Sequence, residues 1–451
     1  TIVEDANQHA DLLQKLLNVS DERSVKLDKG IRMDVDTLLV VISNPDLDNQ
    51  LNQGENLGER DPLKALKRRL EKHEFRYLTN YSLETQLLKR ELTNETDVWR
   101  SENYEEVEKL VRSPLKLKIK RSAKEVIERE IAPHGLEGAA MYNVVSRLDG
   151  EDVPAGLDLV EKAVLFDRGY IQDGDDRLEK DDFNFDNDPN DGKQGIPVTY
   201  ARDIIAELLT EESERSHPEL ELENVITPND IVDAMVEKLN DEPMFSDKER
   251  KKYRDRVKEA KSYIFEQQES DVLRAIMRDK RVDEESVEEY IEHVYAWAEG
   301  EQIENERGQM VDPDPLKMRV FEIEKLGRFS ENDYVDNHQP SPRVKEFRRN
   351  KIVTAMNRYA WKHRTEDFEM GDIDTKEIPV IRAILGTYEW ADVKRTFEDF
   401  EPKHWDNPPT RTETENVKEM TIDNMVEMFD YTKESAELTS RHVMEEVSED
   451  W

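Results

Sequence analysis

The sequence predicts a mainly α-helical protein that carries a few strands of an α/β core near its N-terminus. The first basis is helical periodicity, because apolar residues recur every three to four positions along most of the chain, as in Ile231, Met235 and Leu239. The second basis is the near-continuous apolar run of residues 36–42, which is typical of a strand buried on both faces of a sheet.

The N-terminal elements are predicted to be a helix, a hairpin and that buried strand, in this order. Four leucines between residues 12 and 17 lie on one face of the helix, and residues 24–33 alternate enough for a small hairpin. The polar, glycine- and proline-containing residues 45–62 follow the strand and indicate a loop.

Polar and basic residues follow the predicted strand at positions where a nucleotide-binding enzyme would carry functional side chains. Asn44 stands at the strand's end, and Arg69 lies near the end of a helix predicted at 62–72. In nucleotide-driven enzymes, a polar residue beyond a buried parallel strand positions the attacking water, and a nearby arginine can reach a neighbouring subunit's γ-phosphate. The arrangement resembles the second half of an AAA+ nucleotide module, whose first half is expected to precede Thr1.

In the middle of the chain, the residue pattern predicts helices separated by loops. These helices are expected at about 82–92, 101–111 and 120–131, from His134 onward, and at 199–209. Residues 173–193 are the clearest loop, with nine acidic side chains. They resemble a calcium loop, but Gly192 stands one position too late and Pro197 replaces the final glutamate. A solvated acidic insertion is therefore the favoured interpretation.

A new unit is predicted to begin at Thr227, where the threonine N-cap is followed by Pro228 and then by an acid. Residues 225–451 are expected to be almost wholly helical, with further helices at about 246–278, 284–299, 312–327, 342–364, 376–386, 389–399 and 417–446. Asp312 and Asp314 indicate a turn and an N-cap rather than a catalytic pair. The chain shows no repeat of fixed period.

Composition narrows the class of protein. The 451 residues carry 105 acidic and 66 basic side chains, a net charge of −39 spread along the chain. We interpret this as adaptation to a salt-rich cytoplasm, as in halophilic archaea; an acidic regulatory protein from an ordinary cell is the alternative. No basic face could be assembled from the sequence, which argues against nucleic-acid binding. No apolar run approaches the length of a membrane span, and there is no cysteine.

Several catalytic signatures are absent from the sequence. It contains no His-Glu-x-x-His zinc motif, no Gly-x-Ser-x-Gly nucleophile elbow and no Gly-x-x-x-x-Gly-Lys-Ser/Thr phosphate loop. It also lacks the His-Arg-Asp and Asp-Phe-Gly motifs of eukaryotic protein kinases. Any ATP-dependent activity therefore requires a phosphate loop outside these 451 residues.

Several segments of the chain, taken in order, resemble the PrkA family of AAA+ serine protein kinases. The similarity spans nearly the whole chain in order, and its segments are Ile131-Ala-Pro-His134 with the helix through Arg147-Leu148, Leu159–Asp167, Gly195-Ile196 followed by Tyr200, and residues 290–331. The resemblance implies three parts: the end of the AAA+ core at 1–95, a helical lid at 96–215, and a family-specific helical domain at 220–451.

The resemblance also implies roles for individual residues. Asn44 would be the sensor-1 residue, and Arg69 would be an arginine finger acting in trans, although the neighbouring Arg68 makes that assignment ambiguous. The family's sensor-2 arginine falls at Thr199 in this sequence, and Arg202 is the nearest arginine. Each residue also has a structural alternative: Asn44 as the end of a strand, Arg68 and Arg69 as helix-end cations, and Arg202 as an exposed helix charge.

The implied function is that of an ATP-dependent serine/threonine protein kinase with a protein substrate. ATP and Mg²⁺ would be bound mainly by the missing upstream part, and AAA+ contacts would form a homo-oligomer. An AAA+ ATPase that remodels or degrades a partner protein is one alternative, and a non-enzymatic helical scaffold is another. No nucleic-acid or membrane partner is expected, and the cytoplasm is the expected location.

The charge pattern predicts that stability depends on salt. The Debye length falls from about 10 Å at 0.1 M to about 3 Å at 1 M, so added potassium chloride should weaken the repulsion among acidic side chains and raise the melting temperature. Thermal unfolding followed by circular dichroism across that range measures the effect. A melting temperature that does not change with salt would contradict the interpretation as a halophilic protein.

Overall fold

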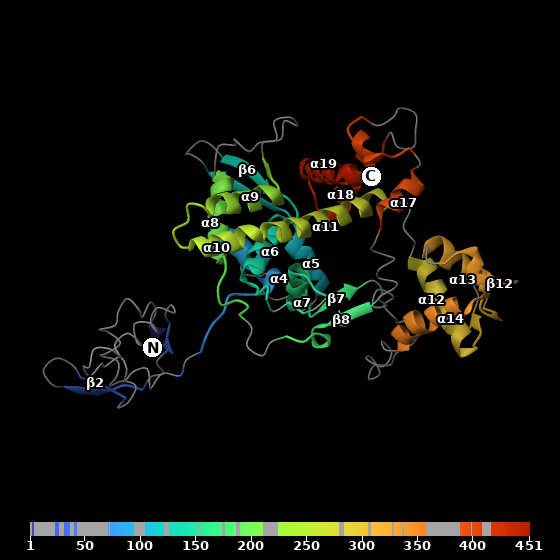
Figure 1. Cartoon of the computed structure of the whole chain (residues 1–451), viewed down its shortest axis with the longest axis horizontal. Coiled ribbons are helices and arrows are strands. Elements are labelled where there is room, and N and C mark those ends of the chain that lie inside the picture. The colour runs from blue at the N-terminus through green and yellow to red at the C-terminus, as the bar shows by residue number, and fades with distance from the viewer. Residues whose placement is uncertain are drawn as a thin grey trace. The chain divides into compact units, whose positions relative to one another are not determined.

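The computed structural model describes most of the chain from residue 73 onward and short stretches before it (Figure 1). The described residues are 2–3, 23–26, 31–36, 40–42, 71, 73–93, 104–120, 126–151, 153–154, 156–173, 176–185, 190–210, 224–278, 284–304, 308–326, 329–335, 338–357, 388–397, 399–407 and 416–451. The chain divides into two compact units, Thr1–Phe75 and Arg76–Trp451.

The described part of the first unit consists of two small ladders. Strand β1 (Ile2–Val3) pairs in parallel with β4 (Val40–Val41), and β2 (Ser24–Lys26) pairs antiparallel with β3 (Arg32–Asp34). The second ladder confirms the predicted hairpin. The expectation of a strand buried on both faces was wrong for the described residues, since Val40 is 42% and Ile42 is 51% exposed. The cause is that the described ladder has only two strands and covers neither face.

The second unit is mainly helical, as predicted. Its helices up to residue 300 are α4 (Tyr81–Thr93), α5 (Tyr104–Arg112), α6 (Gly135–Arg147), α7 (Leu159–Arg168), α8 (Val198–Thr210), α9 (Pro228–Lys238), α10 (Asp247–Asp255), α11 (Val257–Ile276) and α12 (Glu284–Glu299). One continuous apolar core runs from Tyr81 to Tyr263, and α6 lies at its centre with every residue buried. This core includes residues from both sides of the predicted boundary between lid and C-terminal domain.

Local signals set the start of α9 as the sequence predicted. Thr227 is the N-cap, and its hydroxyl and the carboxylate of Asp230 form a capping box ahead of Pro228. The predicted apolar stripe of Ile231, Met235 and Leu239 is fully buried.

Residues 120–131 were predicted to be helical, and this prediction was wrong. Strand β6 (Val126–Ile131) pairs antiparallel with β5 (Leu115–Lys120) along six residues and parallel with β9 (Val225–Ile226). Lysines of β5 stand opposite glutamates of β6, so the strands complement each other in charge. Pairing with the neighbouring β5 and with the distant β9 decided the conformation of a stretch whose own pattern favoured a helix.

Three other predictions needed correction. The expected loop at 173–193 contains the hairpin of β7 (Tyr170–Asp173) and β8 (Asp176–Glu179), followed by the 3₁₀ turn η4 (Lys180–Asp182). The expected helix at 246–278 is broken at Arg256 into α10 and α11. The expected helix at 417–446 is two helices, α18 (Val417–Phe429) and α19 (Lys433–Asp450), because Asp430 adopts a left-handed conformation and Thr432 caps the next helix.

Residues 284–357 form an apolar cluster of their own around Val287, Val294 and Ile352. After α12 come the ladder of β10 (Ile303–Glu304) and β11 (Met310–Val311), α13 (Pro315–Val320), the π-helical turn η7 (Phe321–Lys325), η8 (Glu331–Asp333), the ladder of β12 (Tyr334–Val335) and β13 (Gln339–Pro340), α14 (Pro342–Phe347), and the π-helical turn η10 (Arg348–Val353). Asp314 is the N-cap of α13, as predicted.

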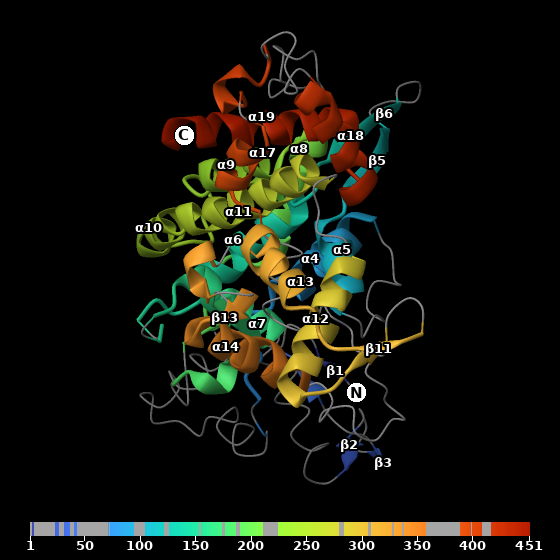
Figure 2. The same ribbon diagram turned by 90° about the vertical axis from the view of Figure 1, so that its right-hand side faces the viewer.

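Toward the C-terminus, α17 (Trp390–Thr396) and the turn η13 (Pro402–His404) precede α18 and α19. Helix α11 packs against both α18 and α19, an arrangement that can be followed in Figures 1 and 2. Among the described residues, none of the helices combines the length and the apolar character needed to cross a bilayer.

The core around α9 predicts a large cost for truncating Met235, which is fully buried. Met235→Ala should lower the free energy of unfolding by about 2–5 kcal/mol, because a cavity is left behind. Met244, which is 56% exposed, provides the matched control, and Met244→Ala should change stability by less than about 0.5 kcal/mol. Urea unfolding of both variants tests this, and equal effects would show that the core is assigned wrongly.

Candidate functional site: a buried ion-pair network

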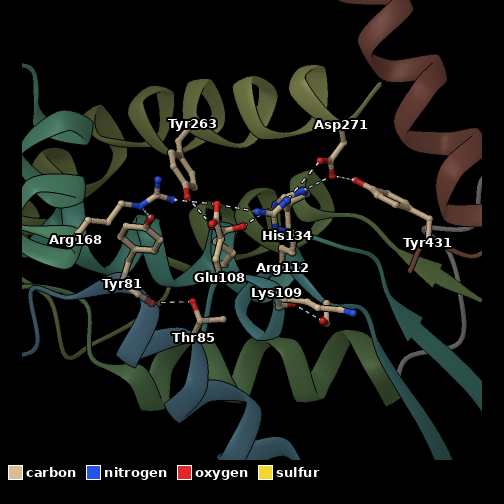
Figure 3. Close-up of polar contacts among 12 residues, drawn as sticks. Tyr81, Thr85, Glu108, Lys109, Arg112, His134, Arg168, Tyr263, Asp271 and Tyr431 are labelled. Atoms are coloured by element: carbon tan, nitrogen blue, oxygen red, sulfur yellow. Dashed lines mark hydrogen bonds and ion pairs between the residues drawn. The ribbon is translucent and has the colours of Figure 1, made fainter. Parts of the chain in front are cut away.

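The most unusual feature of the second unit is a fully buried histidine between two carboxylates (Figure 3). His134 precedes α6 in a left-handed conformation with φ of 65° and is 2% exposed. Its Nδ1 lies 2.6 Å from Oε2 of Glu137, and its Nε2 lies 2.9 Å from Oδ2 of Asp271. Because carboxylates only accept hydrogen bonds, the ring donates from both nitrogens and is an imidazolium.

Further side chains complete the partners of both carboxylates. The hydroxyl of Tyr263 donates to Glu137 over 2.6 Å, and the hydroxyl of Tyr431 donates to Asp271 over 3.2 Å. Arg112 lies 3.9 Å from Asp271 and 2.7 Å from Glu108. We call these residues, together with His134, the histidine network. It joins α5, α6 and α11 to the segment between α18 and α19.

The electrostatics of the network favour ionised groups. Burial alone lowers the pKa of His134, but hydrogen bonds to Asp271 and Glu137, and their negative charges, outweigh it and raise the pKa to about 9. Burial likewise tends to raise the pKa of Glu137, yet the hydrogen bond and charge of His134 lower it below its usual range. At neutral pH the centre of this unit is therefore a buried cation held between two anions.

A second buried cation, Arg147, fastens the start of the unit to its centre. Its guanidinium makes a bidentate pair with Glu84 at 2.6 and 2.9 Å. The same group donates to the carbonyls of Ile196 and Leu78 over distances of 2.7–3.0 Å. All five N–H donors of this arginine are thus used, and the segments before α4 and α8 are fixed to the last turn of α6.

A third buried cation, Lys162, holds the end of the acidic loop. Its ammonium lies 3.0 Å from Asp191, whose other carboxylate oxygen accepts a hydrogen bond from the amide of Asp149. Lys162 is fully buried and Asp191 is 5% exposed, so the prediction of a wholly solvated acidic insertion was wrong at this residue. Gly192 follows with φ of +74°, and a Cβ there would meet the carbonyl oxygen of Tyr77 at 2.6 Å. Only glycine fits this turn.

Residues 284–357 contain a comparable buried pair. Arg348 and Glu322 are both completely buried and form two hydrogen bonds of 2.6 and 2.8 Å. The hydroxyls of Tyr290 and Tyr334 donate to the same carboxylate over 2.8 and 2.6 Å. Both charged residues lie in π-helical turns, so two irregular segments of backbone are joined through one ion pair.

These arrangements are suited to holding elements together rather than to reacting with a substrate. Glu108 and Arg112 are partly exposed, but every other charge is buried and faces a specific partner. Removing one partner would leave the other ion without compensation. In the part of the chain that the structure describes, no group of three or more acidic or histidine side chains could hold a metal ion.

The predicted site residues stand apart from this network. Asn44, Arg68 and Arg69 lie outside the described residues. Thr199 is exposed in the first turn of α8. The guanidinium of Arg202 lies 2.7 Å from Asp203 and 3.2 Å from Glu91. A phosphate at Arg202 would have to displace two carboxylates, so the roles given to Thr199 and Arg202 stay predictions.

Sequence reasoning gave no role to the residues of the histidine network. A signal was present, because Glu137 and Arg147 are charged residues within the otherwise apolar segment that becomes α6. Charged residues on a buried helix need partners, yet nothing local identifies Asp271 as one of them.

The fold and its buried charges define a helical unit fixed internally by ion pairs. A sequence model described as "PrkA serine protein kinase C-terminal domain" matches residues 160–440, and the chain belongs to the PrkA family. It is similar to the "ATP-dependent protease PrkA" of Bacillus subtilis strain 168, with 24% identity over 246 residues. The matched region covers 54% of this chain and 35% of that relative. No solved structure matches the chain.

The histidine network predicts a stability that depends on pH. The pKa of His134 is raised from 6.5 to about 9, so its stabilising contribution is complete below about pH 6.5 and is lost as the pH rises through about 9. The full difference is on the order of 3 kcal/mol. Urea unfolding at intervals across this range should show the decline.

His134→Asn tests the source of this dependence, because asparagine tolerates the left-handed backbone but cannot bridge both carboxylates. The variant should lose about 3–5 kcal/mol near pH 7 and most of the pH dependence. His404→Asn, at a partly exposed position, serves as the matched control and should retain both. If the His134 variant kept the wild-type pH profile, the assignment of the imidazolium would be wrong.

Proposed function

We propose that this chain is part of an ATP-dependent enzyme that acts on proteins and transfers phosphate to serine or threonine. The observation that carries the proposal is the match of residues 160–440 to a family whose description is a serine protein kinase. The matched range includes Asp271 and Tyr431 of the histidine network, so the matched region holds part of the unit's buried centre.

The role proposed for the Arg76–Trp451 unit is to transmit movement. ATP and Mg²⁺ would be bound mainly by a nucleotide module outside the described residues, and AAA+ contacts would assemble a homo-oligomer. Rigid elements carry coupling best when charged groups and packed helices fix them to one another. Arg147 fastens residues before α4 to α6, and His134 fastens α6 to α11, which gives a continuous path through the unit.

ATP-dependent degradation of a partner protein is the second candidate function. It is favoured by the name of the Bacillus subtilis relative, which is an ATP-dependent protease. Both candidates imply a protein substrate and consumption of ATP. A kinase would form a phosphate ester on a substrate hydroxyl and leave the peptide chain intact, whereas a protease would hydrolyse a peptide bond of the substrate.

Identification of the products separates the two candidates. The full-length protein should be incubated with MgATP and an unfolded protein substrate, and the substrate analysed by mass spectrometry. We expect phosphoserine or phosphothreonine in intact substrate chains. Peptide fragments without added phosphate would replace the kinase proposal with the protease.

A double variant connects that activity to the predicted arginine finger. Arg68→Ala combined with Arg69→Ala should lower turnover about 10³-fold while nucleotide binding is kept. Thr199→Ala, at an exposed position on α8, is a comparison variant that reports on the second predicted site. A wild-type rate in the double variant would show that neither arginine is a finger.

A further inference from the structure

Helix α10 and the start of α11 reverse the charge of the rest of the protein. Residues 248–261 contain eight basic and three acidic side chains, a net charge of +5. The whole chain has a net charge of −39, so all other residues together carry −44. We call residues 248–261 the basic strip. The expectation that no basic face could be assembled from the sequence, which argued against nucleic-acid binding, does not hold for this strip.

Several cations of the basic strip lack negative partners. Lys248, Lys251 and Lys258 are exposed and have no ion pair with any carboxylate among the described residues. Arg254 donates to the neutral amide oxygen of Asn240 over 2.6 Å. On β5, by contrast, Lys116 and Lys118 stand opposite Glu130 and Glu128 of β6.

Like charges are also brought together within the strip. Burial lowers the pKa of Lys252, and the positive charge of Arg256 lowers it further. The nearby carboxylates of Asp149 and Asp191 act in the opposite direction without restoring the usual pKa. A bound anion would relieve this repulsion.

The strip rests on a fixed support. Ser246 and Glu249 form a capping box at the start of α10. Tyr253, also on α10, is buried with 1% exposure and anchors the helix to the core. The hydroxyl of Tyr142, on α6, donates to the carbonyl of Tyr253 over 2.9 Å. Figure 1 shows α10 leading directly into α11, which carries Asp271 of the histidine network. The strip is therefore connected to the centre of the unit.

We propose that the basic strip is a docking surface for an acidic segment of a protein substrate. This inference rests on the proposed function, because that function requires protein substrates. Lys248, Lys251 and Arg254 follow at intervals of three, which places them on one side of α10. Such a row suits carboxylates along an extended or helical peptide. A nucleic acid is disfavoured because the net charge of −39 repels a long polyanion away from this short strip.

The test compares two triple variants with the same change in net charge. Lys248→Gln, Lys251→Gln and Lys258→Gln remove the exposed lysines of the strip. Lys118→Gln, Lys120→Gln and Lys345→Gln remove three exposed lysines elsewhere. Equal circular dichroism spectra and melting temperatures establish that both variants fold.

Binding of a short fluorescent oligoglutamate peptide is measured by anisotropy at about 0.1 M potassium chloride, where charges are only partly screened. We expect wild-type binding, a Kd about tenfold weaker in the strip variant, and little change in the control. No ATP is present, so a failure here leaves the enzymatic proposal intact.

Three results would overturn the docking proposal. The wild-type protein could fail to bind the peptide, or both triple variants could weaken binding equally, which would indicate a general charge effect. Tighter binding of a short DNA duplex than of the peptide, lost in the strip variant alone, would assign the strip to nucleic acid.

Discussion

The second unit depends on one buried cation, the imidazolium of His134. Burying a charge is costly unless it is paired and hydrogen-bonded, and this ring is paired on both sides. Its partners belong to different elements, since Glu137 is on α6 and Asp271 is on α11. The two tyrosines that complete them come from α11 and from the segment before α19. The ring therefore fixes the relative positions of helices that local packing alone would allow to shift.

Arg147, Lys162 and Arg348 follow the same principle. Each is a buried cation that donates to a carboxylate of another segment. Replacing such pairs by apolar residues can leave stability unchanged or raise it, so their value lies in the one arrangement that they allow. A unit built this way is suited to move as one body, as the role proposed for it would require.

The buried charges and the overall charge of the sequence follow different patterns. Each buried cation described above faces at least one buried carboxylate. The sequence as a whole carries a large acidic excess, which residues 248–261 reverse locally. An acidic surface keeps the protein soluble and resists indiscriminate contact with other polyanions. A short basic segment on such a surface discriminates by position, because an acidic partner is attracted there and repelled around it.

The sequence by itself determined the features that depend on neighbouring residues. The mainly helical class, the capping box at Thr227, the stripe of Ile231 and Met235, and the hairpin of β2 and β3 are all encoded within a few positions. The sensor and arginine-finger roles in the predicted nucleotide site came from family resemblance instead. Of these, the described Arg202 is held by Asp203 and Glu91 rather than left open to a phosphate.

Only the tertiary structure decided the features that depend on distant partners. Residues 126–131 form a strand because the adjacent β5 and the distant β9 offer backbone partners, and this pairing outweighs the local helical pattern. The charged state of His134 was equally invisible, since Asp271 lies 137 residues away in the sequence. Periodicity and capping operate over one or two turns of chain, whereas strand pairing and buried ion pairs arise only when the folded chain brings remote segments into contact.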